Sequence, residues 1–158
     1  MTIKLRFVGG NAFISEMIEL REGTCMPFPP SHVECVSLDG KWHIGQHIDG
    51  GMLKRPAGYD LPCKELFLDL PATDEQTKGF YDYIEQSIGE PYDWEAILGY
   101  VVPGHFHLTN HAICSAKMDL GLRKVNWYPS KLPLCVPAHC LDPRDLLLIL
   151  SAIIEVPH

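Results

Sequence analysis

The sequence predicts an α+β fold in which a small antiparallel sheet is packed with helices. Two observations lead to this prediction. Short apolar segments separated by turn residues fill the first half of the chain, and longer segments with apolar residues at helical spacing fill the second half. The 158 residues are enough for one domain with a proper core, and no repeat or linker divides them. We therefore treat residues 1–158 as a single domain.

Strand-like segments dominate the first half of the chain. Five segments have the length and apolar content of strands: 3–8, 32–38, 42–48, 52–55 and 65–70. Asp39-Gly40 lies between the second and third of them and is a strong hairpin signal. A helix over residues 11–20, capped by Asn11, is predicted between the first two strands.

Helical spacing dominates the second half. In residues 74–88, Phe80, Ile84 and Ile88 recur at four-residue spacing, and Gly89 follows. Three more helical stretches are predicted: 91–100, a segment from Thr109 or Asn110 to about Leu120 with Gly121 as its stop, and 142–154 with Pro143 at the first helical position.

The charge pattern excludes several classes of function. A net charge of −7 without a Lys/Arg block argues against nucleic-acid binding and gives no attraction to anionic membranes. The longest apolar run, 146–154, is shorter than the roughly 20 residues that span a bilayer, so no integral membrane segment is expected. The first residues lack the features of a signal peptide, which predicts a protein that is cytoplasmic as synthesised. Release by another route or association with a virion stays open.

The candidate catalytic residues are His32, on a predicted strand, and Cys114, in the first turn of a predicted helix. A helix N-terminus and a nearby imidazole together convert a thiol into a thiolate nucleophile. Histidine suits the role of base because its pKa lies near neutrality. Either residue alone is more often structural, so the hypothesis depends on the two residues meeting. The six cysteines are irregularly spaced and are expected to be mostly reduced thiols.

A third group should orient the imidazole. Glu34 lies two residues after His32, so both side chains point to the same face of the strand. The neighbouring strand offers three alternatives: His43, Gln46 and His47. The sequence ranks Glu34 slightly above Gln46 and does not decide among the four.

Four short motifs follow one another between residues 28 and 120: Ser31-His32-Val33-Glu34, Asp49-Gly50-Gly51, Gly89-Glu90-Pro91-Tyr92-Asp93-Trp94 and Cys114-Ser115. In this order they resemble the motifs of permuted papain-like hydrolases of the NlpC type, the bacterial YiiX/YaeF-like group, and most closely variants encoded by phages and prophages. The residues 116–118 after the Cys-Ser pair depart from the pattern of that group.

The resemblance implies a circularly permuted papain-like fold and a thiol hydrolase, an amidase or peptidase that needs no cofactor. It implies that Cys114 is the nucleophile and His32 the base, that Tyr92 lines the substrate site, and that Gln46 is the best candidate for the group's third polar residue. The implied substrate is a peptide or peptidoglycan fragment, cleaved at a stem-peptide amide. A lipid ester or amide hydrolase or acyltransferase is the variant. The oligomeric state is not indicated.

Two alternatives belong to other classes of function. The first is zinc binding, because four possible ligands occur close together: His105, His107, His111 and Cys114. The predicted helix cap places the first two in a loop, so we expect no metal there. His111, one turn before Cys114, then tunes the thiol or binds substrate. The second alternative is a non-catalytic structural or interaction role in a phage particle, because a fold does not guarantee activity.

Overall fold

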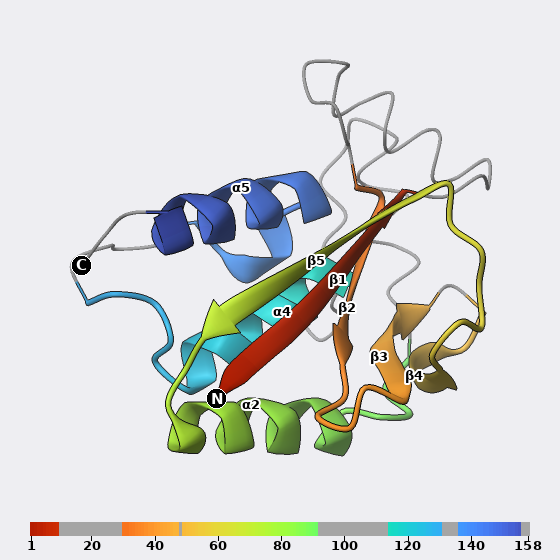
Figure 1. Ribbon diagram of the computed structural model, residues 1–158, viewed down its shortest axis with the longest axis horizontal. Coiled ribbons are helices and arrows are strands. Elements are labelled where there is room, and N and C mark those ends of the chain that lie inside the picture. The colour runs from red at the N-terminus through yellow and green to blue at the C-terminus, as the bar shows by residue number, and fades with distance from the viewer. Residues whose placement is uncertain (10–29, 48, 92–113, 131–135, 156–158) are drawn as a thin grey trace.

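In the part of the chain that the structure describes, a five-stranded antiparallel sheet and three α-helices form an α+β fold (Figure 1). The computed structural model describes residues 1–9, 30–47, 49–91, 114–130 and 136–155. The elements are β1 (Thr2–Gly9), β2 (His32–Val36), β3 (Trp42–His47), β4 (Gly51–Pro56), β5 (Lys64–Pro71), α2 (Asp74–Gln86), α4 (Cys114–Lys124), the short 3₁₀ helix η1 (Ala138–Cys140) and α5 (Pro143–Glu155). The predicted fold class and the five predicted strands are confirmed.

The strands lie in the order β4-β3-β2-β1-β5. The first strand of the chain is therefore an interior strand, with β2 on one side and the edge strand β5 on the other. In this register Arg6 lies opposite Glu34 of β2 and opposite Phe67 of β5. Because successive side chains alternate between the faces of a strand, one register decides which residues of all five strands share a face.

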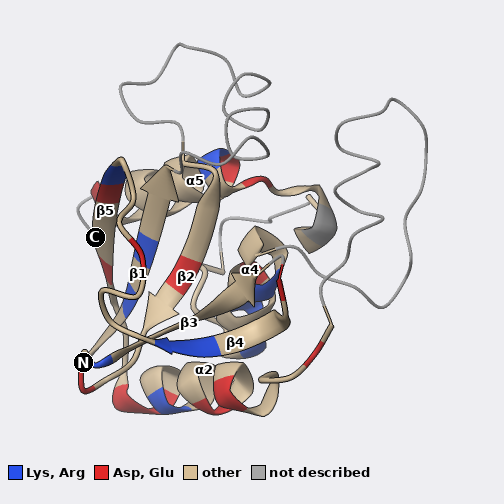
Figure 2. Cartoon of the chain, turned by 90° about the vertical axis from the view of Figure 1, so that its right-hand side faces the viewer, with Lys and Arg blue, Asp and Glu red and all other residues tan. Residues whose placement is uncertain are grey.

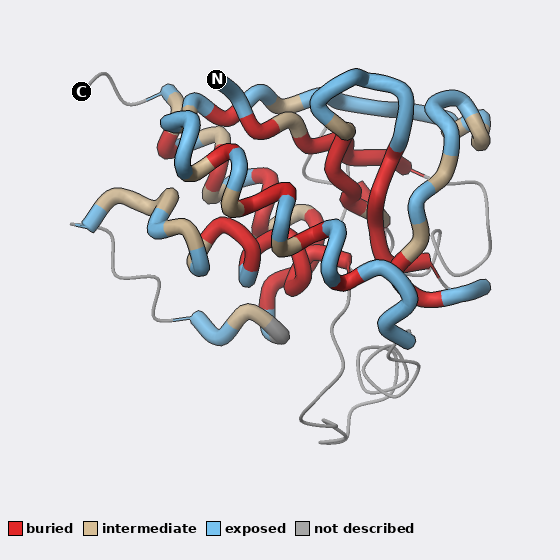
Figure 3. Tube along the Cα trace, turned by 90° about the horizontal axis from the view of Figure 1, so that it is seen from below, coloured by how far each residue is buried: buried red, intermediate tan, exposed pale blue. Residues whose placement is uncertain are grey.

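One face of the sheet is apolar and forms the core with the helices. Ile3, Leu5 and Phe7 of β1 are fully buried on this face, next to Val33 and Cys35 of β2. The helices complete the same cluster with buried residues at helical spacing: Phe80, Tyr81, Ile84, Cys114, Met118, Leu122, Leu146, Leu147 and Leu150. Figure 3 shows these buried stretches along the strands and the inward sides of the helices. Helix α4 therefore lies against β2.

The opposite face of the sheet carries buried charged and polar residues. Arg6, Glu34, His43 and His47 alternate with the apolar positions of their strands, and all are buried. Basic and acidic positions lie side by side on β1 and β2 in Figure 2, as the Arg6–Glu34 pairing requires. Buried charges are costly unless they are paired, so this face differs from the ordinary solvent-exposed face of a sheet.

Local signals define the helix ends, with one exception. Helix α2 begins with a capping box between Thr73 and Gln76, and α5 begins at Pro143 as predicted. The prediction that Gly121 ends its helix is wrong, because α4 continues to Lys124. A Cβ at Gly121 would come within 2.9 Å of the ring of Phe80, so this glycine permits close packing of α4 on α2.

Several sequence predictions lie outside the described residues. They are the helix over 11–20, almost all of the stretch 91–100, the start of the helix that contains Cys114, Tyr92, and the histidines 105, 107 and 111 of the zinc alternative. Among the described helices, none has the length and apolar character to cross a membrane.

Candidate active site

The fold brings Cys114 and His32 into contact although 81 residues separate them along the chain. His32 is the first residue of β2, and Cys114 is the first described residue of α4. The thiol and the imidazole are hydrogen-bonded to each other. Further hydrogen bonds reach the sulfur from the backbone of Val33 and Ser115. We call Cys114 and His32 the dyad.

The dyad favours the charged forms of both groups. Burial acts to raise the pKa of the Cys114 thiol, but the charge and the hydrogen bond of His32 outweigh it and lower this pKa. Burial acts to lower the pKa of His32, but the Cys114 thiolate and the Glu34 carboxylate raise it to about 10. Each group therefore stabilises the ionised form of the other, as a thiolate nucleophile requires.

Glu34 lies at the centre of a polar cluster on the sheet face opposite the core. Its side chain is 0% exposed, and its Oε2 lies 3.7 Å from His32 Nε2. Tyr59 donates a hydrogen bond of 3.2 Å to the same oxygen. Burial acts to raise the pKa of Glu34, yet its interactions with His32, His43 and Arg6 hold this pKa well below its usual range. Glu34 is therefore an anion that can orient the imidazole of His32.

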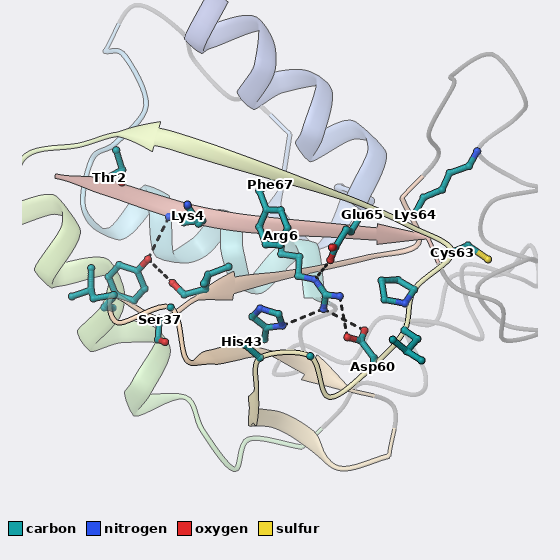
Figure 4. Close-up of a pocket in the computed structure, with 18 of the residues that line it drawn as sticks. Thr2, Lys4, Arg6, Ser37, His43, Asp60, Cys63, Lys64, Glu65 and Phe67 are labelled. Atoms are coloured by element: carbon teal, nitrogen blue, oxygen red, sulfur yellow. Dashed lines mark hydrogen bonds and ion pairs between the residues drawn. The ribbon is translucent and has the colours of Figure 1, made fainter.

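Arg6 balances the charge of this cluster. Its guanidinium is 2% exposed and lies 2.5 Å from Glu34 Oε1. It also forms ion pairs of 2.9 Å with Asp60 and with Glu65 (Figure 4). A guanidinium that meets three carboxylates is fixed in place, so Arg6 holds Glu34 in one position relative to His32.

The three other candidates for the third group occupy different places. His43 Nδ1 lies 3.3 Å from Glu34 Oε1 and 3.2 Å from Arg6, on the side away from His32. The His47 ring lies 5.1 Å from the His32 ring, and its Nε2 is 3.6 Å from Glu34 Oε2. Burial and the charge of His32 lower the pKa of His47 to about 4. Gln46 lies between His43 and His47 in β3, directly before His47, so its side chain points to the opposite face of the sheet. Glu34 is thus the candidate best placed to orient His32.

Gly45 faces Glu34 from the neighbouring strand. A Cβ at this position would lie 2.7 Å from Glu34 Cβ, 3.3 Å from Glu34 Cα and 3.5 Å from His32 Nε2. The two closest of these atoms belong to the rigid part of a strand residue, so they cannot move aside cheaply. Only glycine fits beside the carboxylate.

We expect Gly45→Ala to lower the free energy of unfolding by about 1–3 kcal/mol, because overpacking displaces β2 from β3. Gly50→Ala is the matched control. A Cβ there would meet only the terminal atoms of Leu53, so a change within about 0.5 kcal/mol is expected. Urea unfolding of both variants measures the difference. Equal effects would contradict the close approach at Gly45.

The sequence pattern does not predict three residues of this site: Arg6, Tyr59 and Gly45. Arg6 alternates with apolar residues, which is also the pattern of a strand with one face in water. Tyr59 lies in the connection between β4 and β5, where no periodic signal exists. Only the strand pairing, which the sequence leaves open, could have placed Arg6 and Gly45 at Glu34.

A groove of about 1260 Å³ opens next to the polar cluster. It is bounded by β1, β5 and the segment that leads into β5, and its lining includes Arg6, His43 and Asp60 (Figure 4). Neither residue of the dyad lines it. The groove therefore gives access to the charged residues Arg6 and Asp60 and not to the thiol of Cys114. Tyr92 and His111, the predicted substrate-binding residues, lie outside the described residues.

Comparison with known proteins adds no assignment to this geometry, because no family model and no curated protein matches the chain.

Proposed function

We propose that this chain is a thiol hydrolase in which Cys114 is the nucleophile, His32 the acid–base group and Glu34 the residue that orients His32. The observation that carries the proposal is the hydrogen bond between a thiol and an imidazole from distant parts of the chain. A nucleophile, a base next to it and a carboxylate next to the base are the parts that acyl transfer requires.

The reaction follows from these positions. The thiolate of Cys114 attacks the carbonyl carbon of an amide or ester, and a carbon–sulfur bond forms. The tetrahedral intermediate collapses, the bond to the leaving group breaks, and imidazolium His32 gives its proton to the departing nitrogen or oxygen. A water molecule then passes a proton to His32 and attacks the thioester. The acid product leaves, and Cys114 returns to the thiolate.

The finer part of the proposal concerns family and substrate. The order of histidine before cysteine, with the histidine on a strand and the cysteine on a helix packed against it, suits a circularly permuted papain-like hydrolase. By that resemblance we propose a peptide or peptidoglycan-fragment amide as the substrate, with lipid esters and amides as the variant.

Alkylation by iodoacetamide as a function of pH tests the proposal. We expect the labelling rate of Cys114 to depend less on pH between about pH 6 and 9 than that of a thiol of ordinary pKa, because His32 lowers the pKa of the Cys114 thiol. The free amino acid cysteine, measured alongside, becomes faster as the pH rises through about 8.5. In His32→Asn the labelling of Cys114 should slow at neutral pH and rise with pH. Peptide mass spectrometry locates the label.

Cys35 is the internal control for this experiment. It is a buried thiol on β2, and burial raises its pKa, so it should stay unlabelled in the folded protein. Slow labelling of Cys114 that rises with pH in the unaltered chain would overturn the proposal. So would an unchanged rate in His32→Asn.

A further inference from the structure

We propose that His32, Glu34 and His47 form a binding site for a divalent cation of the Zn²⁺ class, on the side of the His32 ring that faces Glu34. The three candidate ligand atoms are His32 Nε2, Glu34 Oε2 and His47 Nε2, and all lie within 4.8 Å of one another. This set is separate from the cluster of histidines 105, 107 and 111.

The spacing of the three atoms suits a small cation. Each imidazole nitrogen lies close to the shared carboxylate oxygen, at 3.7 Å for His32 and 3.6 Å for His47. Zinc bonds of about 2.0–2.2 Å in a tetrahedral arrangement need ligand atoms roughly 3.3–3.6 Å apart. The two nitrogen–oxygen distances therefore need to contract by only a few tenths of an ångström, and the two nitrogens lie within 4.8 Å of each other. Two imidazoles and one carboxylate are a donor set that zinc uses when its fourth position stays open.

The two imidazole nitrogens have no other partner. Among the described residues, His32 Nε2 and His47 Nε2 are buried nitrogens without a hydrogen bond. The His47 side chain is 9% exposed, so water does not readily satisfy its nitrogen. A buried polar atom without a partner is costly, and a bound cation would remove that cost at both rings.

The residues around Glu34 fix its carboxylate in position and add negative charge to the site. Tyr59 and Arg6 fix Glu34 by hydrogen bonds to its two oxygens, as the groups behind a metal ligand commonly do. Arg6 faces the carboxylates of Glu34, Asp60 and Glu65, so acidic groups outnumber this guanidinium by two. A divalent cation balances that excess.

Metal binding and catalysis are alternatives at this site, a consequence that rests on the proposed hydrolase function. An imidazole whose Nε2 binds a cation cannot also be the imidazolium that protonates a leaving group. The cation further withdraws Glu34 from its orienting role. We therefore infer that zinc inhibits the enzyme reversibly through His32.

Equilibrium dialysis of the Cys114→Ala variant against Zn²⁺, followed by metal analysis, tests the site without the catalytic thiol. We expect one zinc ion per chain, and an affinity at least ~10-fold lower after the further change His47→Gln. His111→Gln is the matched control, because it removes a histidine of the other possible zinc set and should leave the affinity unchanged. Loss of zinc with His111→Gln but not with His47→Gln would overturn the inference.

Two further readouts keep the test decisive if His47→Gln folds poorly. Co²⁺ added to Cys114→Ala should give the visible bands of a four-coordinate nitrogen–oxygen site without a thiolate charge-transfer band. A thiolate band, or no bands, would speak against the ligand set. In the unaltered chain, zinc should suppress the release of p-nitrophenolate from p-nitrophenyl acetate, and a chelator should restore it. Zinc binding in Cys114→Ala without any esterase activity in the unaltered chain would refute only the hydrolase.

Discussion

Cys114→Ala should reduce the formation of an acyl-enzyme from p-nitrophenyl acetate by at least ~10³-fold, because it removes the only thiol of the dyad. The unaltered chain should release a burst of p-nitrophenolate and gain one acetyl group on Cys114. Stopped-flow absorbance and peptide mass spectrometry measure the two products. His32→Asn should lower the burst rate as well, because the thiol then returns to its neutral form.

Cys35→Ala is the matched control for this prediction. Cys35 is also a buried thiol, and it lies in β2 three residues after His32, but its side chain belongs to the core face. Its replacement should leave the burst intact at a modest cost in stability. A burst that survives Cys114→Ala, or acetylation elsewhere on the chain, would show that Cys114 is not the nucleophile.

Arg6→Met should lower the free energy of unfolding by about 3–5 kcal/mol at neutral pH, because it leaves the fully buried Glu34 without its guanidinium. Methionine keeps much of the length of the arginine stem, so the loss reports mainly on charge. Urea unfolding followed by circular dichroism measures the change. Arg55→Met is the control, because Asp49, the partner of Arg55, is 62% exposed and the pair should contribute less than about 1 kcal/mol.

The pH dependence of the Arg6→Met effect has a definite sign. Despite burial, which acts to raise it, the pKa of Glu34 is held below its usual value by His32, His43 and Arg6. A lowered pKa in the folded state contributes stability above the unfolded value of about 4.3, and this contribution is lost as the pH falls. Removing Arg6 raises the folded pKa, so the destabilisation should shrink in acid. A destabilisation that grows in acid would contradict the assigned charge of Glu34.

The sequence predicts the fold class and the strands because their signals are local. Alternating apolar residues and the Asp39-Gly40 turn specify strands whatever they pair with. Pairing itself is not local. Residues 2–9 could have bordered any strand, and only their position between β2 and β5 places Arg6 beside Glu34. Gly121 illustrates the same limit, because a glycine that ends a helix and one that admits a neighbouring ring look alike in sequence.

The sequence predicts the residues of the candidate site to a similar extent, again where the signals are local. His32 and Cys114 could be paired as hypotheses because thiol chemistry needs an imidazole, and Glu34 follows from the two-residue period of a strand. Choosing Glu34 over Gln46 required the register between β2 and β3. This register places His43 and His47 on the face of Glu34 and Gln46 on the opposite face. The ring contact between His32 and His47 had no signal in the spacing.

The interior position of β1, between β2 and β5, has a consequence for synthesis on the ribosome. Its partner β5 is translated more than fifty residues later, so a nascent chain leaves one edge of β1 open until residues 64–71 emerge. During that interval Arg6 lacks Asp60 and Glu65, and Glu34 and His43 are its remaining partners. The sulfur of Cys114 is translated later still, at the start of α4. A truncated translation product therefore carries His32 and Glu34 but lacks Cys114, the nucleophile of the proposed reaction.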